Sequence, residues 1–358
     1  MNFDLSDEQL LLQATVRQFL EKECPPERRR ALFEAEQGFD PVLWKGMIEL
    51  GLGGIHLPEE HGGVGLELLD LTLVAEELGR HAAPGPFLGH ALAGLALLRG
   101  GSEEQRRRWL PKLATGAALG SVALAEAGGA WLPEEWTLAG GEVLDGAKQH
   151  VPFADVADLF VVGVAGGGLA LVEKDAPGVA VEAEDGVDRT RRLSRVRFEG
   201  ARAEPLESGT RAAARVCDAG LVLLAADAWG GASRCVEMAV DYAKTRQQFG
   251  VPIGSFQAHK HQLANLAVEV EPARALVWWA AHASDRAEAE AERAAALAKA
   301  HATDRFMQVA RDTVEAHGGI GFTGECDVQI FFKRALFDRA WLGTPSRHRE
   351  RAAALAGW

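Results

Sequence analysis

Hydrophobic residues recur at helical spacing along much of the chain. Two series in the second half follow the i, i+3, i+4, i+7 pattern of an amphipathic helix: Leu221, Leu224, Ala225 and Ala228, then Val236, Ala239, Val240 and Ala243. The pair Gly230-Gly231 falls between the two series. Glycine there either weakens the helix or lets another backbone approach closely. We therefore expect one long helix. Near its middle, this helix should be either weakened or packed closely against another backbone.

Two capping boxes mark helix starts in the first third of the chain. Ser6 with Gln9, and Ser102 with Gln105, have the S-x-x-Q spacing in which side chains satisfy the first backbone N–H groups of a helix. The second of these helices carries three consecutive arginines, Arg106–Arg108. They either bind an anion or form a solvated helix face.

The hydrophobic period changes after about residue 120. Short segments rich in β-branched and apolar residues, separated by Gly, Asp and Pro, predict strands at 159–164, 169–174, 179–183 and 195–199. In the last segment Val196 and Phe198 alternate with charged residues, as in a strand with one solvated face. A small antiparallel β unit is therefore expected.

The helical period returns after Pro205. The segment RAEAEAERAAALAKA (286–300) predicts an exposed helix of high propensity. A further helix, ending at Gly318-Gly319, is predicted from Phe306, Val309, Ala310 and Thr313. The whole order predicts a mainly α fold with a middle β domain, and domains at 1–120, 121–205 and 206–358.

Composition limits the partners of such a fold. The 358 residues are 47% hydrophobic, which is enough for a large core. A net charge of −13 gives no general attraction to nucleic acid or to an anionic membrane. Any polyphosphate must therefore be held by local basic groups.

Cysteine and histidine patterns predict neither a metal site nor a disulfide framework. The four cysteines lie far apart without a C-x-x-C pair, which suits a reducing cytoplasm. His56 and His61 lack the helical spacing of metal ligands and are interpreted as loop residues. No stretch reaches eighteen consecutive apolar residues, so we expect no membrane span.

The stretch YAKTRQQFGVPIGSFQ (242–257) carries the residues most suited to binding chemistry. It predicts a helix, a tight turn and a second helix that place Arg246, Phe249 and Gln257 on one connected surface. An arginine can bind phosphate with two donors, an aromatic ring can lie against a planar ring, and an amide can bind a base or a ribose. Alternatively, these residues have only structural roles: the arginine caps a helix or pairs with an acid, and the phenylalanine belongs to the core.

This stretch and the later HGGIGFTGE (317–325) resemble the acyl-CoA dehydrogenase family. The resemblance covers nearly the whole chain. It implies an N-terminal helical domain, a β-barrel-like middle domain and a C-terminal four-helix bundle. It also implies FAD as cofactor, α,β-desaturation of an acyl-CoA as the reaction, a role in lipid metabolism, and an electron-transfer flavoprotein as electron acceptor.

The resemblance assigns cofactor-binding roles residue by residue. Arg246 matches the arginine on the FAD pyrophosphate, with Phe249 and Gln257 beside it, and in the family these groups reach the FAD of a neighbouring subunit. The next two matches, Gly318 and Gly319, are the glycines that let backbone approach the ADP half. Glu315 stands where the family usually has a glutamine, and a carboxylate there repels phosphates unless it turns away.

Other family positions have changed. Of the Thr-Glu-Pro that helps to hold the flavin ring, only Glu126 remains. The usual Tyr-Glu-Gly-Thr that holds the catalytic base is Trp341–Thr344 here, with Leu342 in place of the base, although its backbone N–H could still polarise a carbonyl. The alternative base position falls near Gly220, and Asp227, two helical turns further on, is the candidate that remains.

Three hypotheses follow from this pattern. The chain resembles the short, base-less subunits of bacterial heteromeric acyl-CoA dehydrogenases, and would build the site in a homo-oligomer or in a hetero-oligomer with a catalytic paralogue. Alternatively, it is a self-sufficient dehydrogenase that uses Asp227 as base. The third hypothesis is a non-redox acyl-CoA-binding or scaffold member of the same fold.

Overall fold

The computed structural model describes residues 4–358, which divide into two units. The first unit contains the chain up to Phe33, Thr72–Ala83 and Leu221–Trp358, and the second contains Glu34–Leu71 and Pro84–Gly220. Both units draw on residues from the first third of the chain. The division into three consecutive domains stays a prediction.

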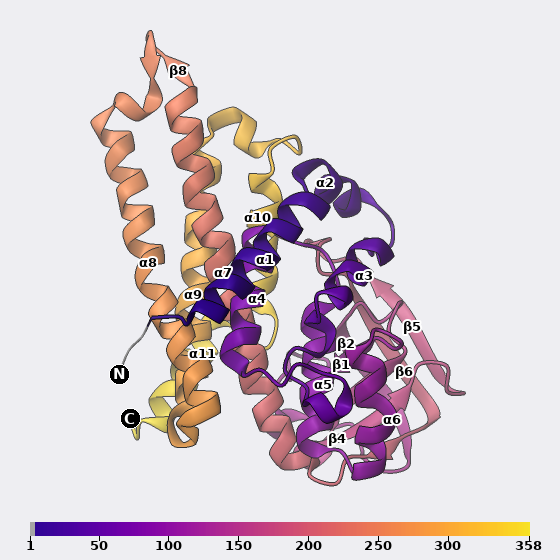
Figure 1. Cartoon of the computed structure of the whole chain (residues 1–358). Coiled ribbons are helices and arrows are strands. Elements are labelled where there is room, and N and C mark those ends of the chain that lie inside the picture. The colour runs from indigo at the N-terminus through magenta and orange to yellow at the C-terminus, as the bar shows by residue number, and fades with distance from the viewer. Residues whose placement is uncertain (1–3) are drawn as a thin grey trace. The chain divides into compact units, whose positions relative to one another are not determined.

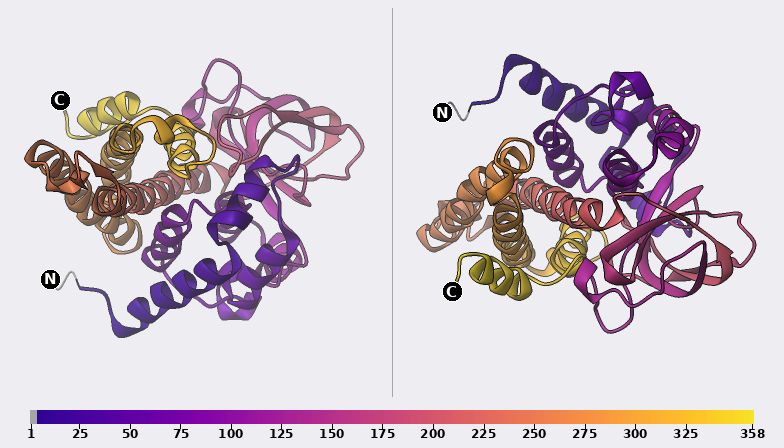
Figure 2. Two further views of the ribbon diagram at one scale, coloured as in Figure 1. Left: turned by 90° about the horizontal axis from the view of Figure 1, so that it is seen from above. Right: turned by 90° about the horizontal axis from the view of Figure 1, so that it is seen from below.

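The first unit is entirely helical apart from a short hairpin. Its first helix, α1 (Asp7–Glu23), begins at the predicted capping box: Gln9 N–H donates to Ser6 Oγ at 3.2 Å, and Ser6 N–H donates to Gln9 Oε1 at 3.0 Å. The unit's other helices are α2 (Pro26–Glu34), most of α4 (Leu68–Arg80) and of α7 (Gly209–Thr245), α8 (Gln257–Arg286), α9 (Glu288–Ala316), α10 (Val328–Ala340) and α11 (Pro345–Leu355). Figures 1 and 2 show the long C-terminal helices gathered side by side into a bundle. The predicted apolar stripe of α9 is buried, at Phe306, Val309, Ala310 and Thr313.

Helix α7 continues through Gly230-Gly231 without a break. A Cβ atom at Gly230 would lie 1.9 Å from the carbonyl oxygen of Glu76 on α4, and one at Gly79 would lie 2.0 Å from the carbonyl oxygen of Asp227. The two helices therefore cross with backbone against backbone. Of the two consequences expected for these glycines, close approach is the one that the structure shows.

The segment 286–300 is not the single exposed helix that the sequence predicts. Helix α8 ends at Arg286, and α9 begins at Glu288. Ala291, Ala295 and Lys299 are fully buried. Alternating Ala and Glu fit a solvated helix. However, the small alanine side chain also allows close packing between helices, and this is why the alanines of α9 are buried.

The second unit combines helices and sheets. Its helices are α3 (Pro41–Glu49), α5 (Phe87–Gly100) and α6 (Glu103–Ala114), and α6 begins at the predicted Ser102–Gln105 capping box. The arginines of α6 pair with acids: Arg107 with Glu103 at 2.9 Å and Arg108 with Glu204 at 2.8 Å. This agrees with a solvated, ion-paired helix face.

Among the described residues, the seven strands of the second unit form two separate sheets. They are β1 (Gly120–Ala123), β2 (Val143–Pro152), β3 (Leu159–Val164), β4 (Gly168–Glu173), β5 (Val179–Glu184), β6 (Leu193–Arg202) and β7 (Glu204–Pro205). The orders are β1-β3-β4-β7 and β2-β6-β5. All pairs are antiparallel except β1 with β3. The four predicted strands are present, and the middle β region that the sequence predicts is confirmed; its strands form two open sheets and no closed barrel within residues 4–358.

Candidate functional site

A short hairpin follows α7 and carries the predicted binding residues. Strands β8 (Gln247–Gln248) and β9 (Val251–Pro252) are joined by Phe249 and Gly250, both with positive φ (54° and 80°). This is the two-residue turn that a right-twisted hairpin favours. It leads through a 3-10 turn, Ile253–Ser255, to α8, so the predicted order of helix, tight turn and helix is confirmed.

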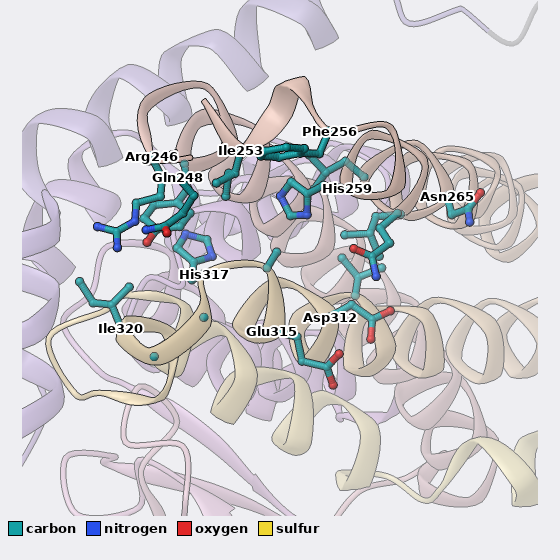
Figure 3. A pocket seen from close by; sticks show the side chains of 18 of the residues that line it. Arg246, Gln248, Ile253, Phe256, His259, Asn265, Asp312, Glu315, His317 and Ile320 are labelled. Atoms are coloured by element: carbon teal, nitrogen blue, oxygen red, sulfur yellow. The ribbon is translucent and has the colours of Figure 1, made fainter. Parts of the chain in front are cut away.

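A groove of about 1270 Å³ lies beside this hairpin. Its walls come from the end of α7, the hairpin, the first half of α8, the end of α9 and the 3-10 segment Gly318–Phe322. Figure 3 shows Arg246, Gln248 and His317 at one end, and Asp312 and Glu315 further along α9. The groove exceeds the usual range of small-ligand pockets, so a dinucleotide is a suitable size of occupant.

Arg246 supplies the cationic end of the groove. Its backbone is fixed on both sides, because its N–H donates to Tyr242 O and its carbonyl accepts from Ile253 N–H, each at 2.8 Å. The side chain is exposed, and within residues 4–358 no carboxylate forms an ion pair with it. A guanidinium held in this way is available for an anionic ligand.

His317 is a lining residue that the sequence analysis did not single out. Its ring stacks on Tyr242, with centroids 4.5 Å apart, and its Nδ1 lies 2.8 Å from the carbonyl oxygen of Thr313. Because a carbonyl only accepts, Nδ1 carries the proton and Nε2 is an acceptor. Burial lowers the pKa of His317, which keeps the ring neutral.

Backbone rather than side chains forms the wall beyond His317. Gly318 has φ 63°, a conformation that favours glycine. At both Gly318 and Gly319 an added Cβ would meet no atom within 4 Å, so the main chain faces open space. Both residues line the groove, where a bulky ligand can come close to their peptide groups.

The far end of the groove is acidic, but each carboxylate has a polar neighbour. Asp312 accepts from Gln308 Nε2 at 2.9 Å, and Glu269 pairs with Arg305 at 2.6 Å. The carboxylate of Glu315 lies 3.9 Å from the Nε of Arg311, at the limit of an ion pair. Arg311 Nε also lies 3.8 Å from Asp312, so Arg305 and Glu269 form the one close ion pair among these three carboxylates of the groove.

The structure brings most of the predicted binding residues together. Lining residues include Arg246, Phe249, Glu315, Gly318 and Gly319, whereas Gln257, the exposed first residue of α8, is not among them. Additional lining residues on α8 are His259, Gln262, Asn265, Leu266 and Glu269. They share one helix face by their spacing of three and four residues, and all except Leu266 are polar, so this spacing is the sequence signal for the α8 wall of the groove. The cofactor roles of all these residues stay predictions.

Asp227 is engaged in a buried ion pair. Its Oδ1 accepts from Arg334 Nε at 2.8 Å and its Oδ2 from Arg334 Nη2 at 2.6 Å. Asp227 is 3% exposed and Arg334 is fully buried. If Asp227 acted as base, it would have to break this pair to take a proton, so the geometry favours a structural contact between α7 and α10.

The retained glutamate of the β region is also fully engaged. Glu126 accepts from Lys148 Nζ at 2.6 Å, from the Thr137 hydroxyl at 2.5 Å, and from the N–H groups of Thr137 and Leu138. Burial opposes its charge, but these donors outweigh burial and lower the pKa of Glu126 to about 2. The segment from Glu126 to Leu138 is thereby closed on itself.

The turn at the usual base position carries no carboxylate. Its residue Leu342 is fully buried with φ 60°.

Across residues 4–358, no cluster of three or more His, Cys, Asp or Glu side chains could hold a metal ion. In the same part of the chain, every helix is too short or too polar to cross a membrane.

Comparison with known proteins agrees with this architecture. The acyl-CoA dehydrogenase N-terminal domain matches residues 6–117 and the C-terminal domain matches residues 207–356. Acyl-CoA dehydrogenase IpdE2 of Mycolicibacterium smegmatis is 37% identical over 351 residues, which cover 98% of this chain and 99% of the relative.

Solved structures of acyl-CoA dehydrogenases are also similar to this chain. The ChsE4-ChsE5 complex from Mycobacterium tuberculosis contains a chain with 29% identity and a TM-score of 0.90, covering 100% of this chain and 99% of that one. An acyl-CoA dehydrogenase complexed with FAD from Bacillus anthracis has 27% identity and a TM-score of 0.88, with 98% and 67% covered. The chain belongs to the acyl-CoA dehydrogenase family, flavoproteins that use FAD to oxidise CH–CH groups of acyl-CoA substrates.

Proposed function

We propose that this chain is the subunit of a heteromeric acyl-CoA dehydrogenase that binds the ADP half of FAD without supplying the catalytic base. The observation that carries the proposal is Arg246, an exposed guanidinium that pairs with no carboxylate of residues 4–358. It lies at the end of the groove where the bare backbone of Gly318 and Gly319 begins. A diphosphate needs such a two-pronged donor and accepts hydrogen bonds from peptide N–H groups that no side chain shields.

The rest of the groove suits the nucleoside part of the same ligand. Neutral His317 offers Nε2 as an acceptor, and Gln262, Asn265 and Gln308 offer amide donors and acceptors along α8 and α9. These groups can recognise hydroxyl and amino groups of a ribose and a purine. The carboxylates of Asp312 and Glu315 would repel phosphates, so we place the diphosphate at Arg246 rather than beside them.

We assign the proton-transfer step to the partner chain because the usual base position of this chain holds no carboxylate and its candidate Asp227 is already paired. Desaturation removes the α proton as the β hydrogen leaves with its electron pair. When bound, FAD supplies the flavin ring that accepts this hydride. Here Leu342 replaces the base, Asp227 is held by Arg334, and Glu126 is occupied by four donors.

Relatives support an assembly of unlike chains. One solved neighbour is a complex of two named chains, ChsE4 and ChsE5. By analogy with the family, we propose an electron-transfer flavoprotein as the electron acceptor. We also propose a reducing cytoplasm as the setting, because four free cysteines would persist there. A non-redox scaffold is not favoured, because the relatives are dehydrogenases.

The test is the visible absorption spectrum of the chain, purified alone and after co-expression with an acyl-CoA dehydrogenase encoded beside it. We expect a colourless chain that becomes yellow with its partner, at one flavin per pair. Arg246→Gln should weaken FAD retention by about tenfold or more, because it removes a charged hydrogen bond to phosphate. Arg305→Gln is the matched control, since that arginine of the same groove is already paired with Glu269. One flavin per chain in the isolated protein would refute the proposal.

A further inference from the structure

Helix α8 contains a proline in its interior. Pro272 lies near the middle of Gln257–Arg286, and the helix continues through it. Proline has no N–H group, so the carbonyl of Val268, four residues earlier, loses its α-helical donor, and the proline ring crowds that carbonyl. A helix bends more readily at such a position than elsewhere. Pro272 therefore divides α8 into a groove segment, 257–271, and a packed segment, 273–286.

The two segments differ in how firmly they are packed. The groove segment buries only Leu266 and Val270. The packed segment, of similar length, buries five residues: Ala273, Val277, Ala280, Ala281 and Ala283. A segment with few buried apolar contacts opens locally at a lower free-energy cost. The groove segment is thus the less firmly held half of α8.

Polar contacts show the same difference. In the packed segment, Trp278 Nε1 donates to Glu76 Oε1 of α4 at 2.7 Å, and Arg274 Nη2 donates to Glu76 Oε2 at 3.3 Å. Within residues 4–358, the side chains of the groove segment make one hydrogen bond or ion pair, that of Glu269 with Arg305 at 2.6 Å. This pair lies three residues from Pro272, so it can persist while the rest of the segment moves.

The loosely packed half is also the half that lines the groove. The groove-lining residues of α8 all precede Pro272: His259, Gln262, Leu263, Asn265, Leu266 and Glu269. Figure 3 shows His259 across the groove from Glu315 of α9. At its other end the segment is joined to α7 through the hairpin, where Ile253 N–H donates to Arg246 O at 2.8 Å. The groove segment is therefore a strap that spans the groove between two attachments.

The position of Pro272 sets the direction in which the strap bends. Pro272 is exposed. Because its ring crowds the backbone on its own face, the helix bends away from that face. Leu263 lies nine residues earlier, about two and a half turns at 3.6 residues per turn, so it is on the opposite face. Leu263 lines the groove, so bending at Pro272 moves this wall inward.

We propose that segment 257–271 is a strap that bends at Pro272 and closes on a dinucleotide held at Arg246. The closure rests on the proposed function, which supplies the dinucleotide, whereas the hinge itself does not depend on it. Closure brings the side chains of Gln262 and Leu263 against the ligand. The open strap admits a large ligand, and the closed strap slows its release.

Hydrogen exchange of the isolated chain tests the hinge without a ligand. Backbone amides of the groove segment should exchange about tenfold faster, or more, than those of the packed segment. Pro272→Ala supplies the missing N–H group, so exchange in the groove segment should slow by about tenfold while the packed segment stays unchanged. Glu271→Ala is the matched control, because it changes an exposed neighbour without adding a donor. Equal exchange in the two segments of the wild-type chain would overturn the proposal.

Release of FAD from the assembly with the partner chain tests the closure. In Pro272→Ala the helix resists bending, so we expect FAD to dissociate about threefold faster or more, although the strap itself exchanges more slowly. A proline with a purely structural role would not give these opposite effects. Glu271→Ala should leave the dissociation rate unchanged. Equal dissociation rates in the wild type and Pro272→Ala would overturn the closure.

Arg246→Gln separates this inference from the proposed function. It should weaken FAD retention without changing hydrogen exchange in the strap, because it removes a ligand contact and leaves the hinge intact. A wild-type assembly that retains no FAD, read from its visible absorbance, would refute the proposed function and the closure with it. An assembly that retains FAD but shows the same release with Pro272 or Ala at this position would refute the closure alone.

Discussion

Asp227 of α7 and Arg334 of α10 form a two-pronged ion pair with both side chains buried. The same guanidinium donates from Nη1 to the carbonyl of Ala83 at 3.3 Å. Replacing a buried pair by apolar residues can be neutral, but removing one partner leaves an uncompensated charge in the core. A substitution of Asp227 therefore distinguishes a role in the stability of the fold from a role as catalytic base.

Asp227→Asn should therefore act on stability. We expect the free energy of unfolding to fall by about 3–5 kcal/mol, because Arg334 keeps its buried charge and loses its partner. Urea unfolding measures this change. Asp304→Asn, which weakens the partly exposed pairs with Arg339 and Arg349, should cost less than about 1 kcal/mol. If Asp227 were the base, its variant would instead keep its stability and its FAD and lose all desaturation.

The crossing of α4 and α7 gives a second prediction. Gly230→Ala should destabilise the chain by about 2 kcal/mol or more, because the new Cβ would lie 1.9 Å from the Glu76 carbonyl oxygen and the helices would have to separate. Thermal unfolding measures the loss. Gly324→Ala is the control, since a Cβ there meets no atom within 4 Å. Equal unfolding temperatures of the two variants would contradict the crossing.

Local patterns predicted the elements more reliably than the contacts between them. Both capping boxes and the strand Leu159–Val164 were predictable because they depend on residues a few positions apart. The turn at Ala287 was not, because alternating Ala and Glu fit one helix as well as two.

The binding groove was predictable in part for the same reason. Its arginine and glycines lie in short motifs, whereas His317 gains its role from stacking on Tyr242. The buried contacts of Arg334 and Lys299 are made with residues 107 and 42 positions away, which no local pattern reveals. Charged residues that the sequence suggests are on the surface can therefore be the most buried in the fold.

The Glu126–Lys148 pair predicts a pH dependence. The pKa of Glu126 is lowered from 4.5 to about 2, so the folded state favours the carboxylate and gains stability above pH 4.5 that is lost as the pH falls toward 2. Glu126→Gln should cost about 3 kcal/mol at pH 7 and progressively less below pH 4.5. Urea unfolding at a series of pH values measures this. The exposed Glu134→Gln is the control, and a cost for Glu126→Gln that stays constant from pH 7 to pH 2 would exclude the ionised pair.

Glu315 tests the direction of the dinucleotide in the groove. Its carboxylate lines the groove and is balanced only by Arg311 at 3.9 Å, so it should repel a diphosphate bound at Arg246. Glu315→Gln should tighten FAD binding by about threefold, the effect of removing about 0.6 kcal/mol of repulsion between partly solvated charges. Equilibrium dialysis of FAD against the assembly at low and high salt measures this gain, which salt should reduce. Glu269→Gln is the matched control, because Arg305 already neutralises that carboxylate of the same groove at 2.6 Å. Weaker FAD binding in Glu315→Gln would mean that the carboxylate accepts hydroxyls of the ribose and that the diphosphate lies further along the groove.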